Sequence, residues 1–361
     1  MTPSLKIVIL GLSITSSWGN GHATTYRGLV RELSRRGHEV LFLERDVPWY
    51  AANRDLPRPA YCKVALYESL EELRDSYGQD VRGADLVIIG SYVPEGVEAA
   101  KWILETGRGI KAFYDIDTPV TLAKLEKGDT EYISPDLIPA FDLYLSFTGG
   151  PTLRFLENHY GAKLARPLYC SVDPDIYIHK KRAPRWDLGY IGTYSKDRQP
   201  ALKAFLIEPA TAWKEGRFVV AGPLYPKDIK WPGNVEHIEH LPPNEHWNFY
   251  NSQRFTLNVT RKDMIKAGFS PSVRLFEAAG CGTPIISDYW KGLESFFEPG
   301  KEILLVRTPQ DVMQILTRLP ETEYREIGRR ARERVLAHHT AAHRAEELLS
   351  YILEVGRPSL A

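Results

Sequence analysis

Short apolar runs alternate with amphipathic segments along almost the whole chain. The first run, residues 5–11, is continuously apolar, which predicts a strand buried on both faces. A glycine-bearing loop at 16–22 follows it, and apolar residues then recur at helical spacing from about 23 to 36, before a second apolar run at 39–43. A strand, loop, helix and strand of these lengths predict a right-handed βαβ unit and therefore a parallel sheet.

The same alternation continues through two halves of similar size, separated by a break rich in turn formers and charges at about 171–185. Further strands are predicted at 85–90, 110–114, 142–146, 188–192, 217–223 (ending in a tight turn), 235–241, 255–259, 283–287 and 302–306. Helical periodicity dominates from 309 to about 355. We therefore predict an α/β protein with two doubly wound, Rossmann-like domains facing a cleft, at residues 1–172 and 173–338. A C-terminal helix within 339–361 is expected to return to the N-terminal domain.

The composition is that of an ordinary globular protein and narrows the possible partners. Of 361 residues, 43% are hydrophobic and 25% charged, and 46 Lys and Arg balance 46 Asp and Glu. This balance argues against a nucleic-acid partner or an anionic membrane surface. Three scattered cysteines indicate neither a disulfide framework nor a zinc site, and the first apolar run is too short for a membrane span or a signal peptide. We expect a cytoplasmic protein; its oligomeric state cannot be read from the sequence.

The stretch 270–287 predicts a short helix followed by a buried strand. Ser270 is expected to cap the helix, Pro271 suits its first position, and Gly280 marks its end. The amino end of such a helix is a natural phosphate site. Glu277 lies seven residues on, roughly 10 Å along the axis, where it could meet the sugar or ribose of a phosphate-bearing ligand. An ordinary αβ unit with Glu277 on a solvated face is the alternative.

Two such halves with this stretch in the second resemble the GT-B glycosyltransferases, and in particular the CgeB-like (spore-maturation type) family. The resemblance rests on residues 270–284 and 292–302, and it is supported by 192–198 and 115–119. It is strong in the second half of the chain and loose in the first. It implies a nucleotide-sugar donor on the second domain, an acceptor on the first, and no metal or other cofactor.

The resemblance also implies individual roles in the second half. The implied donor-binding residues are Gly192, Thr193, Tyr194, Lys196, Arg198, Gly222, Pro223, Ser272, Val273, Arg274 and Glu277. Glu277 would bind ribose hydroxyls, and Lys196 or Arg198 would be the cationic partner of the diphosphate, unless both lie on a solvated loop. Many retaining members carry a second acid about eight residues before this glutamate. Here that position lies near Phe269 and has no acid, so the stereochemical outcome stays open.

The first half offers two candidates for a catalytic base. His22 follows Gly19-Asn20-Gly21 at a helix start, and a neutral imidazole there could deprotonate an acceptor hydroxyl; a loop or capping histidine is the alternative. Asp115 and Asp117 form an Asp-x-Asp pair after a strand. For Asp117 we favour base duty or acceptor contact over metal ligation, with a structural cap as the alternative. The predicted acceptor or sugar contacts are Asn20, Gly21, Asp115, Asp288 and Tyr289.

Two charged or histidine-rich segments near the end of the chain are assigned no function. The basic run 325–334 alternates with glutamates and predicts a solvated helix face. His338, His339 and His343 lack nearby acids or cysteines, so no metal site is predicted there.

The sequence thus favours a metal-independent glycosyltransferase that moves a sugar from a nucleoside-diphosphate-sugar donor to an unidentified acceptor. The alternatives are a nucleotide-sugar epimerase of the same fold, which needs no acceptor, and a non-catalytic nucleotide-sugar-binding protein.

Overall fold

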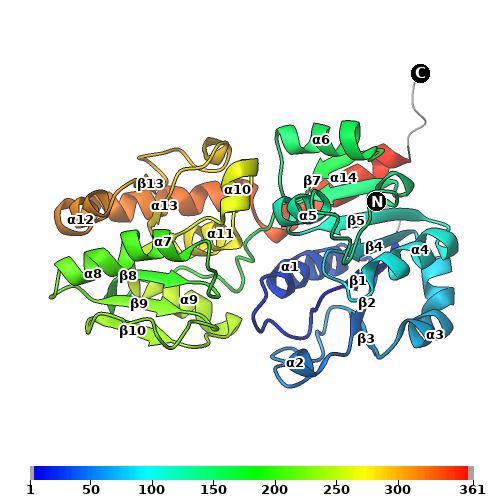
Figure 1. The fold of residues 1–361 in the computed structure, drawn as a ribbon, viewed down its shortest axis with the longest axis horizontal. Coiled ribbons are helices and arrows are strands. Elements are labelled where there is room, and N and C mark those ends of the chain that lie inside the picture. Colours follow the sequence, from blue (N-terminus) through cyan, green and yellow to red (C-terminus); the bar gives the residue numbers. More distant parts are fainter. Residues whose placement is uncertain (1–3, 357–361) are drawn as a thin grey trace. The chain divides into compact units, whose positions relative to one another are not determined.

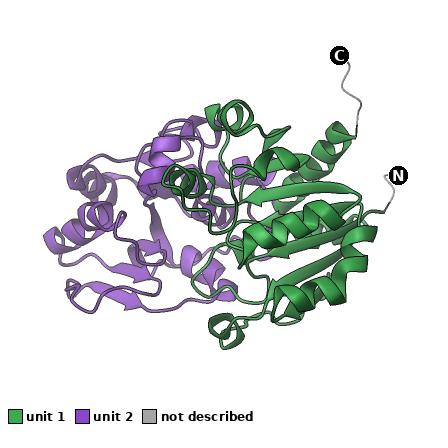
Figure 2. Ribbon diagram, turned by 45° about the vertical axis from the view of Figure 1, so that its right-hand side comes forward, with its two compact units in different colours: residues 1–170, 341–361 green, residues 171–340 purple. Residues whose placement is uncertain are grey.

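The computed structural model describes residues 4–356 and divides into two compact units (Figures 1 and 2). Unit 1 comprises residues 1–170 and 341–361, and unit 2 comprises 171–340. The sequence placed the corresponding boundaries after 172 and 338, two residues from each observed boundary. The last five residues of the C-terminal segment proposed from the sequence lie outside the described residues.

Unit 1 contains a seven-stranded parallel sheet with the order β3-β2-β1-β4-β5-β6-β7. Its strands are β1 (Lys6–Gly11), β2 (Glu39–Arg45), β3 (Lys63–Tyr67), β4 (Leu86–Gly90), β5 (Ile110–Asp115), β6 (Leu143–Ser146) and β7 (Ala165–Pro167). All residues of β4 and all but the first of β1 are buried, because helices cover both faces of a parallel sheet.

The helices of unit 1 form two layers, each with its own apolar core against the sheet. They are α1 (His22–Arg35), α2 (Pro48–Ala51), α3 (Leu70–Gly83), α4 (Gly96–Thr106), α5 (Thr118–Leu125), the 3-10 turn η1 (Ile138–Ala140), α6 (Pro151–Tyr160) and α14 (Ala341–Val355). Helix α14 is the chain's return to unit 1. It packs against α1, where Arg36 pairs with Glu346 at 2.8 Å.

Unit 2 repeats this architecture with a six-stranded parallel sheet in the order β10-β9-β8-β11-β12-β13. Its strands are β8 (Trp186–Ile191), β9 (Phe218–Ala221), β10 (Val235–Ile238), β11 (Gln253–Asn258), β12 (Ile285–Ser287) and β13 (Leu304–Leu305). Its helices are α7 (Gln199–Leu202), the π-helical turn η2 (Lys203–Ile207), α8 (Glu208–Ala212), α9 (Pro243–Asn251), α10 (Lys262–Ala267), α11 (Val273–Gly280), the 3-10 turn η3 (Leu293–Ser295), α12 (Pro309–Arg318) and α13 (Glu321–His338).

The strand order defines where each unit can bind a ligand. In unit 1 the order reverses direction between β1 and β4, and in unit 2 between β8 and β11. Ligands of doubly wound sheets bind beyond the carboxyl ends of the strands at this reversal. We therefore expect ligand-binding residues in the loops after β1, β4, β8 and β11.

Several elements differ from the sequence prediction. Strand β3 and helix α3 were not predicted at all, and the strands expected at 235–241 and 302–306 end at Ile238 and span only Leu304–Leu305. No helix within residues 4–356 is both long and apolar enough to cross a membrane.

Candidate functional site

Helix α11 begins two residues later than its sequence suggests. Ser272, not Ser270, is its N-cap, and Val273 is the first helical residue. The prediction that Ser270 and Pro271 start the helix was therefore wrong. The hydroxyl of Ser272 does not cap the helix but donates to Oδ1 of Asn258, 2.8 Å away at the end of β11. This bond ties the helix start to the carboxyl edge of the sheet of unit 2.

Arg274 fixes α11 against the end of a second strand. Its Nε donates to the carbonyl of Ile191 at 2.6 Å, its Nη1 donates to Oδ1 of Asn258 at 2.8 Å, and its guanidinium lies over the ring of Tyr190. The side chain is buried, yet neither hydrogen bond is made to a carboxylate. A positive charge is thus held beside the amino end of α11.

Arg198 brings a second cation to the same edge. Its Nη2 donates to the carbonyl of Thr193 at 2.6 Å, while its Nε is buried without a hydrogen-bond partner among the described residues. Burial, together with Arg274 and Arg261, lowers the pKa of Arg198. Because like charges repel, a site that gathers these arginines is suited to an anion that compensates them. Lys196, the other predicted cation of this loop, is exposed.

The loops after β8 and β9 approach each other closely at two glycines. Gly222 has φ +144°, and a β-carbon there would overlap the carbonyl oxygen of Gly192. A β-carbon on Gly192 would in turn press on Arg274 Nη2, at 2.8 Å. Tyr194 joins the two loops, because its backbone N–H donates a hydrogen bond to the carbonyl of Pro223 at 3.0 Å. The structure thus brings together the predicted residues of 192–194 and 222–223 around the guanidinium groups of Arg198 and Arg274.

Glu277 lies in a buried cluster of tyrosines. The hydroxyl of Tyr177 donates to its Oε1 at 2.6 Å, and that of Tyr250 donates to its Oε2 at 3.1 Å. His246 Nδ1 is 4.0 Å from the same carboxylate. Glu277 is only 4% exposed, so the solvated face considered from the sequence is excluded. Two hydroxyl bonds leave the carboxylate with acceptor capacity for a further donor.

Asp288 and Tyr289, which follow β12, differ in their hydrogen bonding and exposure. The carboxylate of Asp288 accepts hydrogen bonds from the backbone N–H of Thr260 at 3.0 Å and from its hydroxyl at 2.7 Å, and burial raises its pKa. Tyr289 is 46% exposed. Asp288 therefore supports the loop after β11, whereas the Tyr289 ring is available to a ligand.

In unit 1, His22 and Asp117 form a pair at the carboxyl ends of the strands. The Nε2 atom of His22 lies 3.0 Å from Oδ2 of Asp117, and the ring edge of His22 faces Tyr92. The His22 side chain is 8% exposed and its Nδ1 is buried without a hydrogen-bond partner among the described residues, whereas the Asp117 side chain is 25% exposed. Solvent and ligands therefore reach the carboxylate more easily than the imidazole.

Asp115 is fully buried behind this pair. Its carboxylate accepts hydrogen bonds from Tyr144 at 2.6 Å and from Thr121 at 2.7 Å, and it also accepts one from the backbone N–H of Asp117 at 3.2 Å. Burial raises the pKa of Asp115 to about 6. A residue with no exposed surface cannot touch an acceptor, so the predicted acceptor contact by Asp115 is wrong, and its role is to hold the Asp117 turn.

The loop before α1 is shaped by its asparagine. Asn20 Oδ1 accepts a hydrogen bond from the N–H of Ala23 at 3.1 Å, and its Nδ2 donates to the carbonyls of Ser16 and Trp18. Gly21, the N-cap of α1, is exposed beside it. Asn20 thus fixes the helix start that carries His22. Among residues 4–356, no group of three or more His, Cys, Asp or Glu side chains is arranged to hold a metal ion.

Several site residues were missed by sequence reasoning. Asn258 joins Ser272 to Arg274, Tyr177 and Tyr250 hold Glu277, and Tyr92 lies beside His22 with φ +62°. Only Asn258 had a signal, since it is a polar residue at the end of a predicted strand. The others become neighbours of the site only through tertiary folding.

Comparison with known proteins agrees with this architecture. Residues 198–350 match the glycosyl transferase-like family. The structure resembles sucrose-phosphate synthase from Thermosynechococcus elongatus at a TM-score of 0.69 and 13% identity, over 97% of this chain and 99% of that one.

Two further structures are similar over 97% of this chain and all of theirs. Anabaena HepE in complex with UDP-glucose matches with a TM-score of 0.70 and 14% identity. An α-glucosyltransferase in complex with UDP-glucose and DNA matches with a TM-score of 0.71 and 12% identity. A search of curated proteins found no match. The chain therefore has the GT-B fold of two parallel-sheet, Rossmann-like domains.

Proposed function

We propose that this chain is a glycosyltransferase that moves a sugar from a nucleoside-diphosphate-sugar donor to a hydroxyl, or similar nucleophile, of an acceptor, without a metal ion. The observation that carries the proposal is the pair Arg198 and Arg274 at the amino end of α11, with an unpartnered buried Nε on Arg198. A helix start and two guanidinium groups make a site for a diphosphate.

The same groups serve catalysis as well as binding. Negative charge grows on the diphosphate as its bond to the sugar breaks, and guanidinium groups already held in place stabilise that charge without reorganising. Ser272 and Val273 border the diphosphate at the helix start. Glu277 receives the ribose hydroxyls, held by its two tyrosines, and Tyr289 contacts the sugar.

Asp117 is the base that we propose for the acceptor. It takes the proton of the acceptor hydroxyl as the oxygen of that hydroxyl attacks the anomeric carbon. The bond from that carbon to the diphosphate oxygen breaks, and the nucleoside diphosphate leaves with the bonding electrons. His22 donates its Nε2–H to Asp117 and orients it, because a carboxylate that serves as a base can only accept a hydrogen bond. Asn20 and Gly21 line the acceptor side.

We also propose that the chain belongs to the CgeB-like family, which residues 270–284 resemble. The transferred sugar in this proposal is a hexose. Because the HepE and α-glucosyltransferase structures named above are both complexes with UDP-glucose, UDP-sugars are the first donors to test.

The test is a thermal-shift screen of nucleoside diphosphates followed by a turnover assay. UDP, GDP, ADP and CDP are compared, since a bound ligand raises the melting temperature by mass action. The stabilising base is then supplied as its sugar conjugates, with and without an acceptor mixture. Nucleoside diphosphate release that depends on acceptor supports the proposal. A new sugar isomer from donor alone would instead identify an epimerase, and binding without turnover a binding protein.

A further inference from the structure

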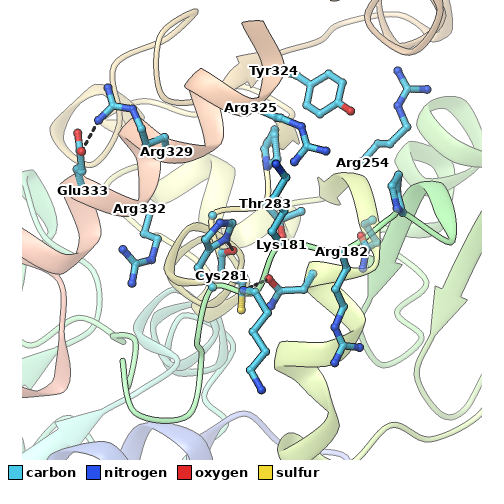
Figure 3. Close-up of a pocket in the computed structure, with 17 residues that line it drawn as sticks. Lys181, Arg182, Arg254, Cys281, Thr283, Tyr324, Arg325, Arg329, Arg332 and Glu333 are labelled. Carbon is cyan, nitrogen blue, oxygen red and sulfur yellow. Dashed lines mark hydrogen bonds and ion pairs between the residues drawn. The ribbon is translucent and has the colours of Figure 1, made fainter. Parts of the chain in front are cut away.

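Unit 2 contains a cavity of about 360 Å³ that the proposed donor site does not use. Its floor is formed by residues 281–284, the loop between α11 and β12, and by the first residues of β11. One wall is the segment 179–184 before β8, and the other is one face of α13 (Figure 3). All of these elements lie within residues 171–340, so the cavity belongs to unit 2 alone.

The cavity is strongly cationic although the whole chain is neutral. Seven of its lining side chains are Lys or Arg, whereas Glu333 is the single acidic one among its described lining residues. In Figure 3, Lys181, Arg182, Arg254 and Arg325 lie around Cys281 and Thr283, whereas Arg329 points toward Glu333. The basic run at 325–334 is therefore not only a solvated face, since Arg325, Arg329 and Arg332 line this cavity.

Three of the arginines are neutralised by their neighbours. Arg254 pairs with Asp187 at 2.9 Å, Arg325 with Glu321 at 2.6 Å, and Arg329 with Glu326 at 2.6 Å and with Glu333. These pairs shape the wall and add little net charge.

Four cations remain without a carboxylate partner in the described part of the chain: Lys180, Lys181, Arg182 and Arg332. Arg332 donates Nε to the carbonyl of Gly280 at 3.1 Å, which leaves its Nη atoms for a ligand. Lys180 and Arg182 both lie over the ring of Trp247. Concave walls of one charge sign focus the electric field, so these four attract an anion more strongly than dispersed surface cations would.

The cavity and the donor site lie at opposite edges of one sheet. Gln253, the first residue of β11, lines the cavity, whereas Asn258 at the end of β11 holds Arg274. Five steps along a strand span roughly 16 Å. The arginines at the amino end of α11 therefore cannot share a small ligand with the cavity.

We infer that this cavity is a second ligand site, which binds a phosphate-bearing small molecule of sugar-phosphate size. Its volume matches the lower range of small-molecule pockets, roughly 300–1,000 Å³. Guanidinium and ammonium groups from two separate segments are the usual partners of phosphate oxygens. A hollow of about 360 Å³ is the right size for one small ligand.

The test measures binding of fructose 1,6-bisphosphate, inorganic phosphate and unphosphorylated fructose by calorimetry. The bisphosphate is expected to bind most tightly, and fructose not at all. In a Lys181→Glu/Arg182→Glu double variant its affinity should fall at least about 10-fold, the loss of roughly one charged hydrogen bond. Lys214→Glu is the matched control, because Lys214 is an exposed lysine of unit 2 outside the cavity, and it should bind as the wild type does.

Two outcomes would overturn the inference. One is equal affinity of the double variant and the wild type for the bisphosphate. The other is loss of bisphosphate binding in Arg198→Ala but not in the double variant, which would place the phosphates at the amino end of α11. Nucleoside diphosphate binding, measured on the same proteins, reports on the donor site separately, so failure of one assignment leaves the other standing.

Discussion

The imidazole Nε2 of His22 lies 3.0 Å from the carboxylate of Asp117, although 95 residues separate them in the chain. The contact forms because β1 and β5 belong to the same parallel sheet, so the segments that follow them emerge at the same edge. It joins the two residues between which the sequence could not choose a base. Their unequal exposure, 8% against 25%, gives them different roles.

Asp117→Asn is expected to reduce kcat by roughly 100- to 10,000-fold, the usual contribution of a general base. His22→Ala should cost less, because it removes only the group that orients Asp117. Neither change should alter nucleoside diphosphate affinity, since the arginine site is built within unit 2. Steady-state kinetics and calorimetry check this, with His159→Ala as an exposed-histidine control. A larger loss in His22→Ala than in Asp117→Asn would make the histidine the base.

Arg198→Ala should weaken nucleoside diphosphate binding by roughly 10- to 100-fold, since hydrogen bonds to charged groups contribute about 1.5–3 kcal/mol. Lys196→Ala, two residues away and exposed, should change the affinity by less than about threefold, as expected for a surface charge. Calorimetric titration of both variants decides which cation binds the diphosphate. The reverse order of effects would contradict the assignment of Arg198.

Glu277→Ala is expected to destabilise the protein, because it removes the acceptor of two buried tyrosine hydroxyls. A buried donor left unsatisfied costs about 1–3 kcal/mol. Urea unfolding should show this loss, and a Tyr177→Phe/Tyr250→Phe/Glu277→Leu triple variant, which removes the hydroxyls as well, should recover part of it. The recovered variant can then be tested for nucleotide binding, where a loss would support the ribose role independently of folding. Unchanged stability in Glu277→Ala would show that the tyrosines find other acceptors.

The sequence predicted the architecture well because buried parallel strands leave a strong local pattern. A continuous apolar run such as 5–11 directly predicts a buried strand. Strand β3 has only one buried residue among its five, so its sequence contains no comparable run. The start of α11 was misplaced because Ser270-Pro271 satisfies the rules for capping locally. The competing bond from Ser272 to Asn258 is set by tertiary structure.

The candidate site was predictable in position but not in contacts. Loops after strands located His22, Asp117 and Arg198, since the reversal of strand order follows from the βαβ pattern. No local pattern shows that Tyr177, a hundred residues before Glu277, would bond it. The cavity lined by α13 was missed for the same reason, because an alternation of Arg and Glu along one helix does not show what faces it.

Chelation is expected to leave turnover intact. The proposed donor site neutralises the diphosphate with Arg198, Arg274 and the start of α11, so it needs no divalent ion to bridge the phosphates. Initial rates measured after exhaustive treatment with EDTA should match those of the untreated enzyme. Loss of activity that Mn²⁺ restores would revive the metal interpretation of the Asp-x-Asp pair, with Asp117 as its exposed member.

Asp115 should make unit 1 less stable as the pH rises from about 4 to above 6. Its pKa is raised to about 6 by burial, above its ordinary 3.8, so in this range the folded state binds more protons than the unfolded state. The stability from neutral Asp115 is complete below pH 4 and lost as the pH passes 6, an effect on the order of 2–3 kcal/mol. Asp115→Asn should remove it, because hydroxyls of Tyr144 and Thr121 can accept from as well as donate to an amide.

Because other groups titrate too, the quantity to measure is the difference in unfolding free energy between wild type and Asp115→Asn at pH 4.5 and at pH 7. The unfolding free energy of Asp115→Asn should increase relative to that of the wild type as the pH rises. Asp80→Asn, at an exposed site of the same unit, should show the same pH dependence as the wild type. A difference that stays constant between the two pH values would mean that Asp115 is already ionised in the folded protein at pH 4.5. The hydrogen bonds from Tyr144 and Thr121, which favour the carboxylate, would then outweigh its burial.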